Sequence, residues 1–226
     1  MLLIFDLDGT LINTIDDLGQ ACNHALSACG FPTHKIEDYP RLVGNGINKL
    51  IERALPEEHR NEATVLRLRE YFVPFYDQHN CDLTRPYDGI PELLQTLKAA
   101  GHTLAVASNK YQAATEKIVA HFFPNTFDVV LGERVGVPRK PDPQVVWDIC
   151  SALSNKTDGS ELCGIVQHGS ALSCLYVGDS LVDAATAKAA NLPFVACTWG
   201  FCTKEQLLTV TPDHMVNHPL EILTLI

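Results

Sequence analysis

The sequence predicts an α/β protein in which helices cover both faces of a parallel sheet, with an all-helical insert after the first strand. Apolar segments of strand length alternate with helical patterns from residue 90 onward, which is typical of a parallel sheet. One further strand pattern, Leu2–Phe5, stands apart at the start of the chain. Between this first strand and the alternating region, residues 14–84 show helical spacing and no strand pattern. We therefore expect an α/β domain made of residues 1–13 and 86–226, and a helical domain made of residues 14–85.

The elements of the insert follow from helical spacing. Residues 15–29 place small and apolar side chains on one side, and Gly30 and Pro32 end that helix. Further helical patterns cover residues 47–55 and 57–76. The loop Gly44-Asn45-Gly46 lies between them and the first helix, and its glycines allow the backbone to approach a ligand closely. An ordinary connection between helices remains the other interpretation of this loop.

After turn residues at 86–91, helices and strands alternate to the end of the chain. The expected helices cover residues 91–100, 112–122, 143–153, 181–190 and a last one near 219–225, and the expected strands cover 103–107, 127–131, 174–177 and 194–197. The segment Ser154–Ser173 is rich in Ser, Gly, Asn and Asp, and we predict a surface loop there.

Composition excludes several classes of function. The chain has 226 residues, 46% of them hydrophobic, and a net charge of −10, so no general basic field is present to bind nucleic acid or an anionic membrane. No apolar run approaches membrane-spanning length. The eight cysteines form no C-x-x-C pair, which argues against zinc and a disulfide framework. The first residues lack a basic region typical of a signal peptide, and we expect a cytoplasmic protein.

Polar side chains follow three of the predicted strands. Asp6 and Asp8 come after the first, Ser108 and Asn109 after another, and Asp179 after a third. Ligands of parallel sheets bind outside the carboxyl ends of the strands, so we expect these groups to meet there. Carboxylates are hard oxygen ligands that suit Mg²⁺. For the first pair alone, a surface strand end with an ordinary Asp-Gly turn is an equal alternative.

Positive charge for a phosphate ligand must come from a local side chain, because the chain as a whole is acidic. Lys140 lies in a stretch stiffened by prolines and is the candidate cation. We expect Ser108, the Asn109 backbone and Lys140 to bind phosphate, with Gly9 allowing close approach of the backbone. Asp183 follows Asp179 by four residues and is expected to orient Lys140 or a metal-bound water.

These residues together resemble the four ordered motifs of phosphatases of the haloacid dehalogenase superfamily. The matching positions are Asp6–Thr10, Ser108, Lys140, and Gly178–Ser180 with Asp183. A closer resemblance, to phosphoglycolate phosphatases, rests on Val43–Gly46, Glu52–Leu55, Ser108–Lys110 and Trp199–Phe201. The resemblance implies a Rossmann-like, doubly wound parallel sheet with an inserted α-helical cap. It also implies a Mg²⁺-dependent phosphatase that hydrolyses a small phosphate monoester such as phosphoglycolate.

The resemblance also implies a role for each site residue. Asp6 would be the nucleophile that forms an aspartyl-phosphate, and Asp8 would be the general acid and base. Thr10 would help to hold Asp8 in place. Mg²⁺ would be bound by the Asp6 carboxylate, the Asp8 backbone carbonyl and Asp179. The cap would close over the substrate with Gly44, Asn45 and Gly46 facing the leaving group.

Three alternatives remain at this stage. The first is another enzyme of the same superfamily, such as a β-phosphoglucomutase-like phosphosugar mutase, a sugar phosphatase, or a phosphonatase using a lysine such as Lys49. A dehalogenase is a weaker alternative, because it would not need Asp8. The last is a binding or regulatory protein without catalytic activity, although Asp6, Asp8 and Lys140 are all present. Monomer and homodimer are both open as oligomeric states.

Overall fold

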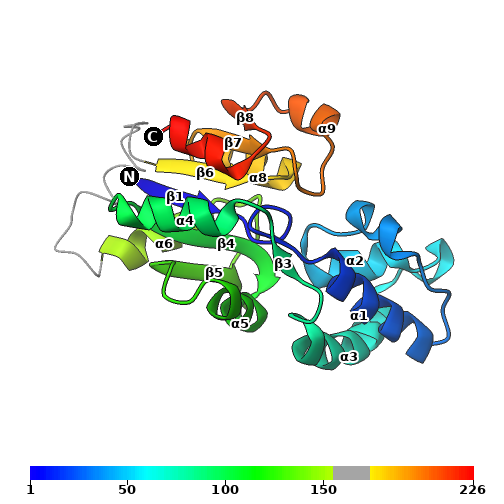
Figure 1. Ribbon diagram of the computed structural model, residues 1–226. Coiled ribbons are helices and arrows are strands. Elements are labelled where there is room, and N and C mark those ends of the chain that lie inside the picture. The colour runs from blue at the N-terminus through cyan, green and yellow to red at the C-terminus, as the bar shows by residue number, and fades with distance from the viewer. Residues whose placement is uncertain (155–173) are drawn as a thin grey trace. The chain divides into compact units, whose positions relative to one another are not determined.

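The computed structural model describes residues 1–154 and 174–226 (Figure 1). Its described part divides into two compact units, one of residues 1–12 and 86–226 and the other of residues 13–85. The first unit has an α/β fold with a parallel sheet, which confirms the predicted fold class. Apart from Ser154, the predicted loop Ser154–Ser173 lies outside the described residues.

The sheet of the α/β unit has six strands in the order β5-β4-β1-β6-β7-β8. The strands are β1 (Leu2–Phe5), β4 (Thr103–Tyr111), β5 (Val129–Glu133), β6 (Cys174–Gly178), β7 (Phe194–Cys197) and β8 (His214–Val216). All neighbouring strands are parallel. The chain builds the β4–β5 side first and then returns to the other side of β1, so the strand order reverses between β1 and β6.

Helices cover the sheet on both faces. They are α4 (Ile90–Ala99), α5 (Gln112–Phe122), α6 (Gln144–Ser154), α8 (Leu181–Ala189), α9 (Lys204–Leu208) and the 3₁₀ helix η3 (Pro219–Thr224). One buried cluster joins Leu2 and Ile4 of β1 to apolar residues of α6, α8 and α9. Side chains alternate along a strand, so Leu3 and Phe5 face the other side of the sheet, the side of α4 (Figure 1). Both faces of β1 are therefore buried.

The helical unit contains three α-helices and two 3₁₀ helices. They are α1 (Ile15–Ala28), η1 (Ile36–Arg41), α2 (Gly46–Ala54), η2 (Glu57–His59) and α3 (Glu62–His79). The buried Asp17 of α1 accepts hydrogen bonds from the N–H groups of Leu83 and Thr84 and from the Thr84 hydroxyl, at 2.7–3.1 Å. This carboxylate ties the beginning of the unit to its end. The short strands β2 (Ile12–Asn13) and β3 (Arg85–Pro86) pair where the chain passes between the units.

Several elements differ from their prediction. β4 continues through residues 108–110 to Tyr111, with a shift of register after Ala107, where the sequence predicts the strand to end. The strand predicted at 127–131 lies at Val129–Glu133. β8 and α9 are absent from the prediction because segments of three and five residues are too short to show a period.

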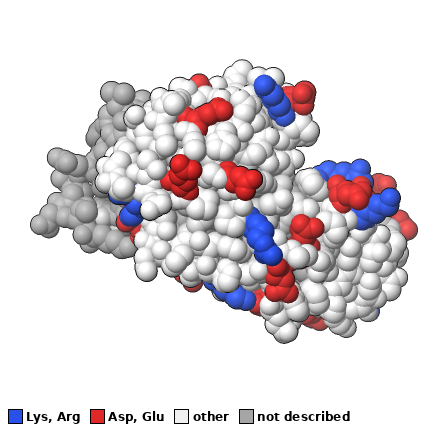
Figure 2. Space-filling view, in the orientation of Figure 1, with Lys and Arg blue, Asp and Glu red and all other residues white. Residues whose placement is uncertain are grey.

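No helix among the described residues is both long and apolar enough to span a membrane. On the face drawn in Figure 2, basic and acidic side chains are interspersed over the described residues. The seven described cysteines form no disulfide with one another.

Candidate active site

The predicted polar residues of the α/β unit meet at the carboxyl ends of three adjacent strands. Asp6 follows β1, Asp179 follows β6, and Ser108 lies in the last part of β4. β4 and β6 pair with β1 on its two sides, so the carboxyl ends of the three strands lie next to one another. The reversal of strand order between β1 and β6 is also here, and this is where open α/β sheets bind ligands.

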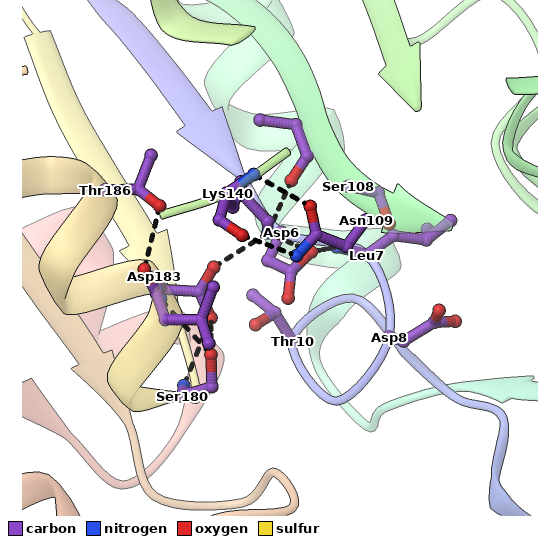
Figure 3. A network of polar contacts seen from close by, with 12 residues as sticks. Asp6, Leu7, Asp8, Thr10, Ser108, Asn109, Lys140, Ser180, Asp183 and Thr186 are labelled. Carbon is purple, nitrogen blue, oxygen red and sulfur yellow. Dashed lines mark hydrogen bonds and ion pairs between the residues drawn. The ribbon is translucent and has the colours of Figure 1, made fainter. Parts of the chain in front are cut away.

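Three carboxylates and one lysine form a buried network, of which Figure 3 shows Asp6, Asp183 and Lys140. A carboxylate oxygen from each of Asp6, Asp179 and Asp183 lies within 4.8 Å of the others. The Lys140 Nζ atom contacts Asp6 Oδ1 and Asp183 Oδ1, each at 2.8 Å, and donates to the Ala107 carbonyl at 2.9 Å. Of the two roles expected for Asp183, the structure supports orientation of Lys140.

Charge in this network is unbalanced. Burial raises the pKa of Asp6 well above its usual range, and Asp183 adds to the effect, while Lys140 opposes it. Burial, with Asp183, also raises the pKa of Asp179 to about 7. Burial disfavours the charge of Lys140, but Asp183 and Asp6 raise its pKa well above the usual value. One lysine facing three buried carboxylates leaves excess negative charge, which a divalent cation would neutralise.

Asp179 is held by residues from two loops. The Thr10 hydroxyl donates to Asp179 Oδ1 at 2.9 Å, and the Phe201 N–H donates to Oδ2 at 2.8 Å. Trp199 Nε1 donates to the Thr10 carbonyl at 3.0 Å and links the two loops. The family resemblance implies that Thr10 helps to hold Asp8, which stays a prediction; the contact of the Thr10 hydroxyl with Asp179 is an additional one that the sequence did not indicate. Spacing along the chain cannot show this contact, because it joins residues 169 positions apart.

Gly200 gives a first prediction about Asp179. A Cβ atom at position 200 would overlap the Cβ and the carboxylate of Asp179, so Gly200→Ala should displace that carboxylate. A displacement of about 1 Å in a catalytic site costs on the order of 10²-fold in rate, and we expect a loss of kcat/KM of that size. Activity measured over a series of divalent-cation concentrations checks this, with a higher midpoint expected for the variant. Gly101→Ala, where a Cβ meets no atom within 4 Å, is the control for general strain at a glycine.

Near the end of β4, three consecutive residues have different partners. The Ser108 hydroxyl accepts a hydrogen bond from the Lys110 N–H at 3.1 Å. The Asn109 side chain accepts from the Lys140 N–H and donates to the Lys140 carbonyl, both at 3.0 Å. This pair of bonds fixes the lysine-bearing loop against β4. Asn109 thus has a contact that the sequence did not predict, in addition to its expected place beside Ser108.

Lys110 is the residue of the site that sequence reasoning missed. Its Nζ atom lies 2.9 Å and 2.8 Å from the two carboxylate oxygens of Asp8. Only 3% of the Lys110 side chain and 22% of the Asp8 side chain are exposed. Figure 3 shows the Asp8 carboxylate directed away from the Lys140 network. The one signal in the sequence that pointed to Lys110 is the segment Ser108–Lys110, which is similar to a segment of phosphoglycolate phosphatases. That similarity does not show which residue Lys110 contacts.

The remaining predicted residues lie in two places. Gly9 has a φ of +91°, and its N–H donates to the Ile12 carbonyl at 2.9 Å, within the turn that follows β1. Gly44, Asn45 and Gly46 also have positive φ values and lie in the helical unit, where α2 begins. Their part in substrate binding remains a prediction.

The donor set fits a hard divalent cation. Each carboxylate oxygen of Asp183 accepts two hydrogen bonds, whereas each oxygen of Asp179 accepts one. Asp6 contacts the Lys140 ammonium group through Oδ1. Carboxylates whose pKa is raised by burial and by one another become stable as anions when a cation binds between them. Asp6 and Asp179 are thus the better candidates for direct ligands, and Asp183 for a supporting residue.

Known proteins resemble this chain over nearly its full length. Residues 3–197 match the family model of haloacid dehalogenase-like hydrolases. The chain is 33% identical over 220 residues to the phosphoglycolate phosphatase of Mesorhizobium japonicum, covering 96% of this chain and 90% of that protein. It is 29% identical to the phosphoglycolate phosphatase of Haemophilus influenzae, covering 100% and 97%. A crystal structure described as a predicted phosphoglycolate phosphatase, from Haemophilus somnus, superimposes with a TM-score of 0.85 at 27% identity, covering 99% and 96%.

Proposed function

Because the chain belongs to the haloacid dehalogenase-like hydrolase family, we propose that it is a Mg²⁺-dependent phosphatase that hydrolyses small phosphate monoesters, phosphoglycolate first among them. The observation that carries the proposal is the contact of Asp6 with Lys140 beside Asp179, at the reversal of strand order. A buried carboxylate next to a lysine is placed to attack a phosphoryl group whose oxygens that lysine binds.

In the proposed first step, an Asp6 oxygen attacks phosphorus and the bond from phosphorus to the ester oxygen breaks. Asp8 donates a proton to the departing alcohol oxygen, which leaves an aspartyl-phosphate on Asp6. In the second step, Asp8 removes a proton from water, the water oxygen attacks phosphorus, and the bond to Asp6 breaks. The products are the alcohol, inorganic phosphate and the restored carboxylate of Asp6.

The other site residues bind and orient the reacting groups. In this proposal Lys140 and Ser108 bind the phosphoryl oxygens, and Asp183, whose Oδ1 lies 2.8 Å from the Lys140 Nζ atom, orients Lys140. The carboxylates of Asp6 and Asp179 and the backbone carbonyl of Asp8 would hold Mg²⁺. When bound, the ion would supply Lewis-acid stabilisation of charge on the phosphoryl oxygens. Thr10 and Phe201 keep Asp179 in place for this.

The substrate is proposed from the relatives, which are phosphoglycolate phosphatases at about 30% identity. Phosphate release from a panel of esters tests the proposal, with phosphoglycolate, hexose phosphates and nitrophenyl phosphate in the panel. We expect Mg²⁺-dependent release from all of them and the highest kcat/KM with phosphoglycolate. Conversion of a hexose phosphate into its isomer without release of phosphate would point to a mutase. Binding of esters without turnover would point to a protein without catalytic activity.

Removal of the metal gives a second prediction, with a defined pH dependence. Protein in EDTA should lose nearly all phosphatase activity and regain it with Mg²⁺, whereas Ca²⁺ should inhibit because it favours looser coordination. The raised pKa of Asp179, about 7 without metal, means that below pH 7 a proton must leave before Mg²⁺ binds. Affinity for Mg²⁺ should therefore rise with pH through the range near 7 in which Asp179 loses its proton.

Calorimetric titration of the protein with Mg²⁺ in the absence of substrate measures that affinity and the protons released. Asp128→Asn is a matched control, because Asp128 pairs with Lys98 outside the acidic network. Full activity in EDTA would contradict the proposed metal site. A Mg²⁺ affinity that does not change between pH 5 and pH 7 would contradict a proton on Asp179 in the metal-free protein.

A further inference from the structure

Lys110 and Lys140 are the two buried basic side chains of the described residues. The proposed reaction uses Lys140 to bind the phosphoryl group, but it assigns no contact with the substrate to Lys110. A buried lysine costs free energy unless a charged or polar group compensates it. Asp8 compensates it here, with both carboxylate oxygens within 2.9 Å of the Lys110 Nζ atom.

The backbone of Lys110 is fixed on both sides. Its N–H donates to the Ser108 hydroxyl at 3.1 Å, and its carbonyl accepts from the Thr115 hydroxyl at 3.0 Å. Ser108 and Lys110 thus stand in a fixed relation, one beside the phosphoryl site and the other beside Asp8. Two groups held in this way can bind two parts of one ligand, and little conformational entropy is lost because the backbone is already ordered.

We propose that Lys110 binds an anionic group on the alcohol side of the substrate. The preferred substrates are then phosphate esters whose alcohol carries a carboxylate one carbon away from the ester oxygen. This inference rests on the proposed phosphatase function and adds to it the class of leaving group and the residue that selects it.

The position of Asp8 supports this assignment. Asp8 must contact the ester oxygen to protonate it, so the alcohol lies on the side of the phosphate where Asp8 stands. In a 2-carboxy ester such as phosphoglycolate, the carboxylate carbon is two covalent bonds from the ester oxygen. The Lys110 ammonium group contacts Asp8 at 2.8 Å, so we expect that carboxylate to lie within its reach.

Charge supports it as well. An anionic leaving group would approach Asp6, Asp8 and Asp179 in a protein with a net charge of −10, and it would be repelled without a local cation. Lys110 supplies one positive charge at the point where this repulsion would arise. A lysine ammonium is a compact point charge that adapts to several acceptors, so contact with Asp8 and with a substrate carboxylate are compatible.

A comparison of two substrates tests the inference on the natural protein. The substrates are phosphoglycolate and the phosphate ester of glycolamide, which has the same length and no charge on its alcohol. A charge-assisted hydrogen bond contributes enough to change an equilibrium about 10- to 100-fold, and we expect kcat/KM to favour phosphoglycolate by that factor. Equal kcat/KM values for the two esters would overturn the inference before any variant is made.

Substitution of Lys110 assigns the preference to this residue. Lys110→Met should lower the ratio of the two kcat/KM values to near one, and Lys110→Arg should keep most of it. Lys98→Met is the matched control, because Lys98 also pairs with an aspartate, at 3.0 Å from Asp128, but outside the site. It should leave the ratio unchanged. If Lys110→Met does not fold, Lys110→Arg and the natural protein still provide the comparison.

Each remaining outcome has a defined meaning. Equal losses on both esters in Lys110→Met would overturn the inference and would mean that Lys110 only positions Asp8. A ratio that stays high in Lys110→Met would place the recognition of the carboxylate elsewhere. Absence of phosphate release from either ester by the natural protein with Mg²⁺ would contradict the proposed phosphatase function instead.

Discussion

The Asp6→Asn variant should retain its fold and lose nearly all phosphatase activity. The amide has the shape of the carboxylate but lacks the charge and nucleophilicity needed to form an aspartyl-phosphate. Removal of a catalytic nucleophile lowers kcat by on the order of 10⁴-fold or more, and we expect a loss in that range. Steady-state phosphate release measures it, and acid quenching during turnover should trap phosphoenzyme in the natural protein only.

The stability of Asp6→Asn separates loss of chemistry from loss of fold. Burial and the neighbouring carboxylates disfavour the Asp6 charge, so the metal-free variant should have a Tm equal to or above that of the natural protein. Asp16→Asn, an exposed position in α1, is the matched control and should keep full activity. Substantial activity in freshly purified Asp6→Asn, with deamidation excluded by mass spectrometry, would remove Asp6 from the mechanism.

The Asp8→Ala variant should show a loss of rate that depends on the leaving group. Asp8 offers the metal only its backbone carbonyl in the proposed site, so Mg²⁺ binding should remain largely intact. Loss of a general acid costs about 10²–10⁴-fold, and this penalty is greatest where the leaving alcohol needs a proton. The phosphorylation step should therefore suffer more with an alkyl phosphate than with nitrophenyl phosphate, whose leaving group departs almost unaided.

Single-turnover kinetics with the two esters tests the role of Asp8. Because Asp8 also activates water in the second step, Asp8→Ala should accumulate aspartyl-phosphate with nitrophenyl phosphate. Asp8→Asn, which keeps a polar side chain near Lys110, should show the same dependence on the leaving group. Equal penalties on phosphorylation with both esters would mean that Asp8 is not the acid and that its contact with Lys110 serves another purpose.

The sequence alone was sufficient for the elements with a clear period and for the residues at strand ends. The apolar run Leu2–Phe5 could be predicted as a buried strand because hydrophobic burial acts on each such segment independently of its partners. Asp6, Ser108 and Asp179 could be predicted as neighbours because parallel strands bring their carboxyl ends to one edge. Short segments without a period, such as β8, could not be predicted, because pairing with β7 stabilises them.

Only the tertiary structure decided which side chain contacts which. Thr10 bonds Asp179, because the turn after β1 places its hydroxyl next to β6. Lys110 contacts Asp8 from the last part of β4, within the stretch where the pairing with β5 shifts register. Such contacts join residues about a hundred or more positions apart, and their geometry depends on strand order and local irregularities. The periodicity and spacing of a sequence carry no information on strand order or on local irregularities. The partners of the charged residues could therefore be seen only in the tertiary structure.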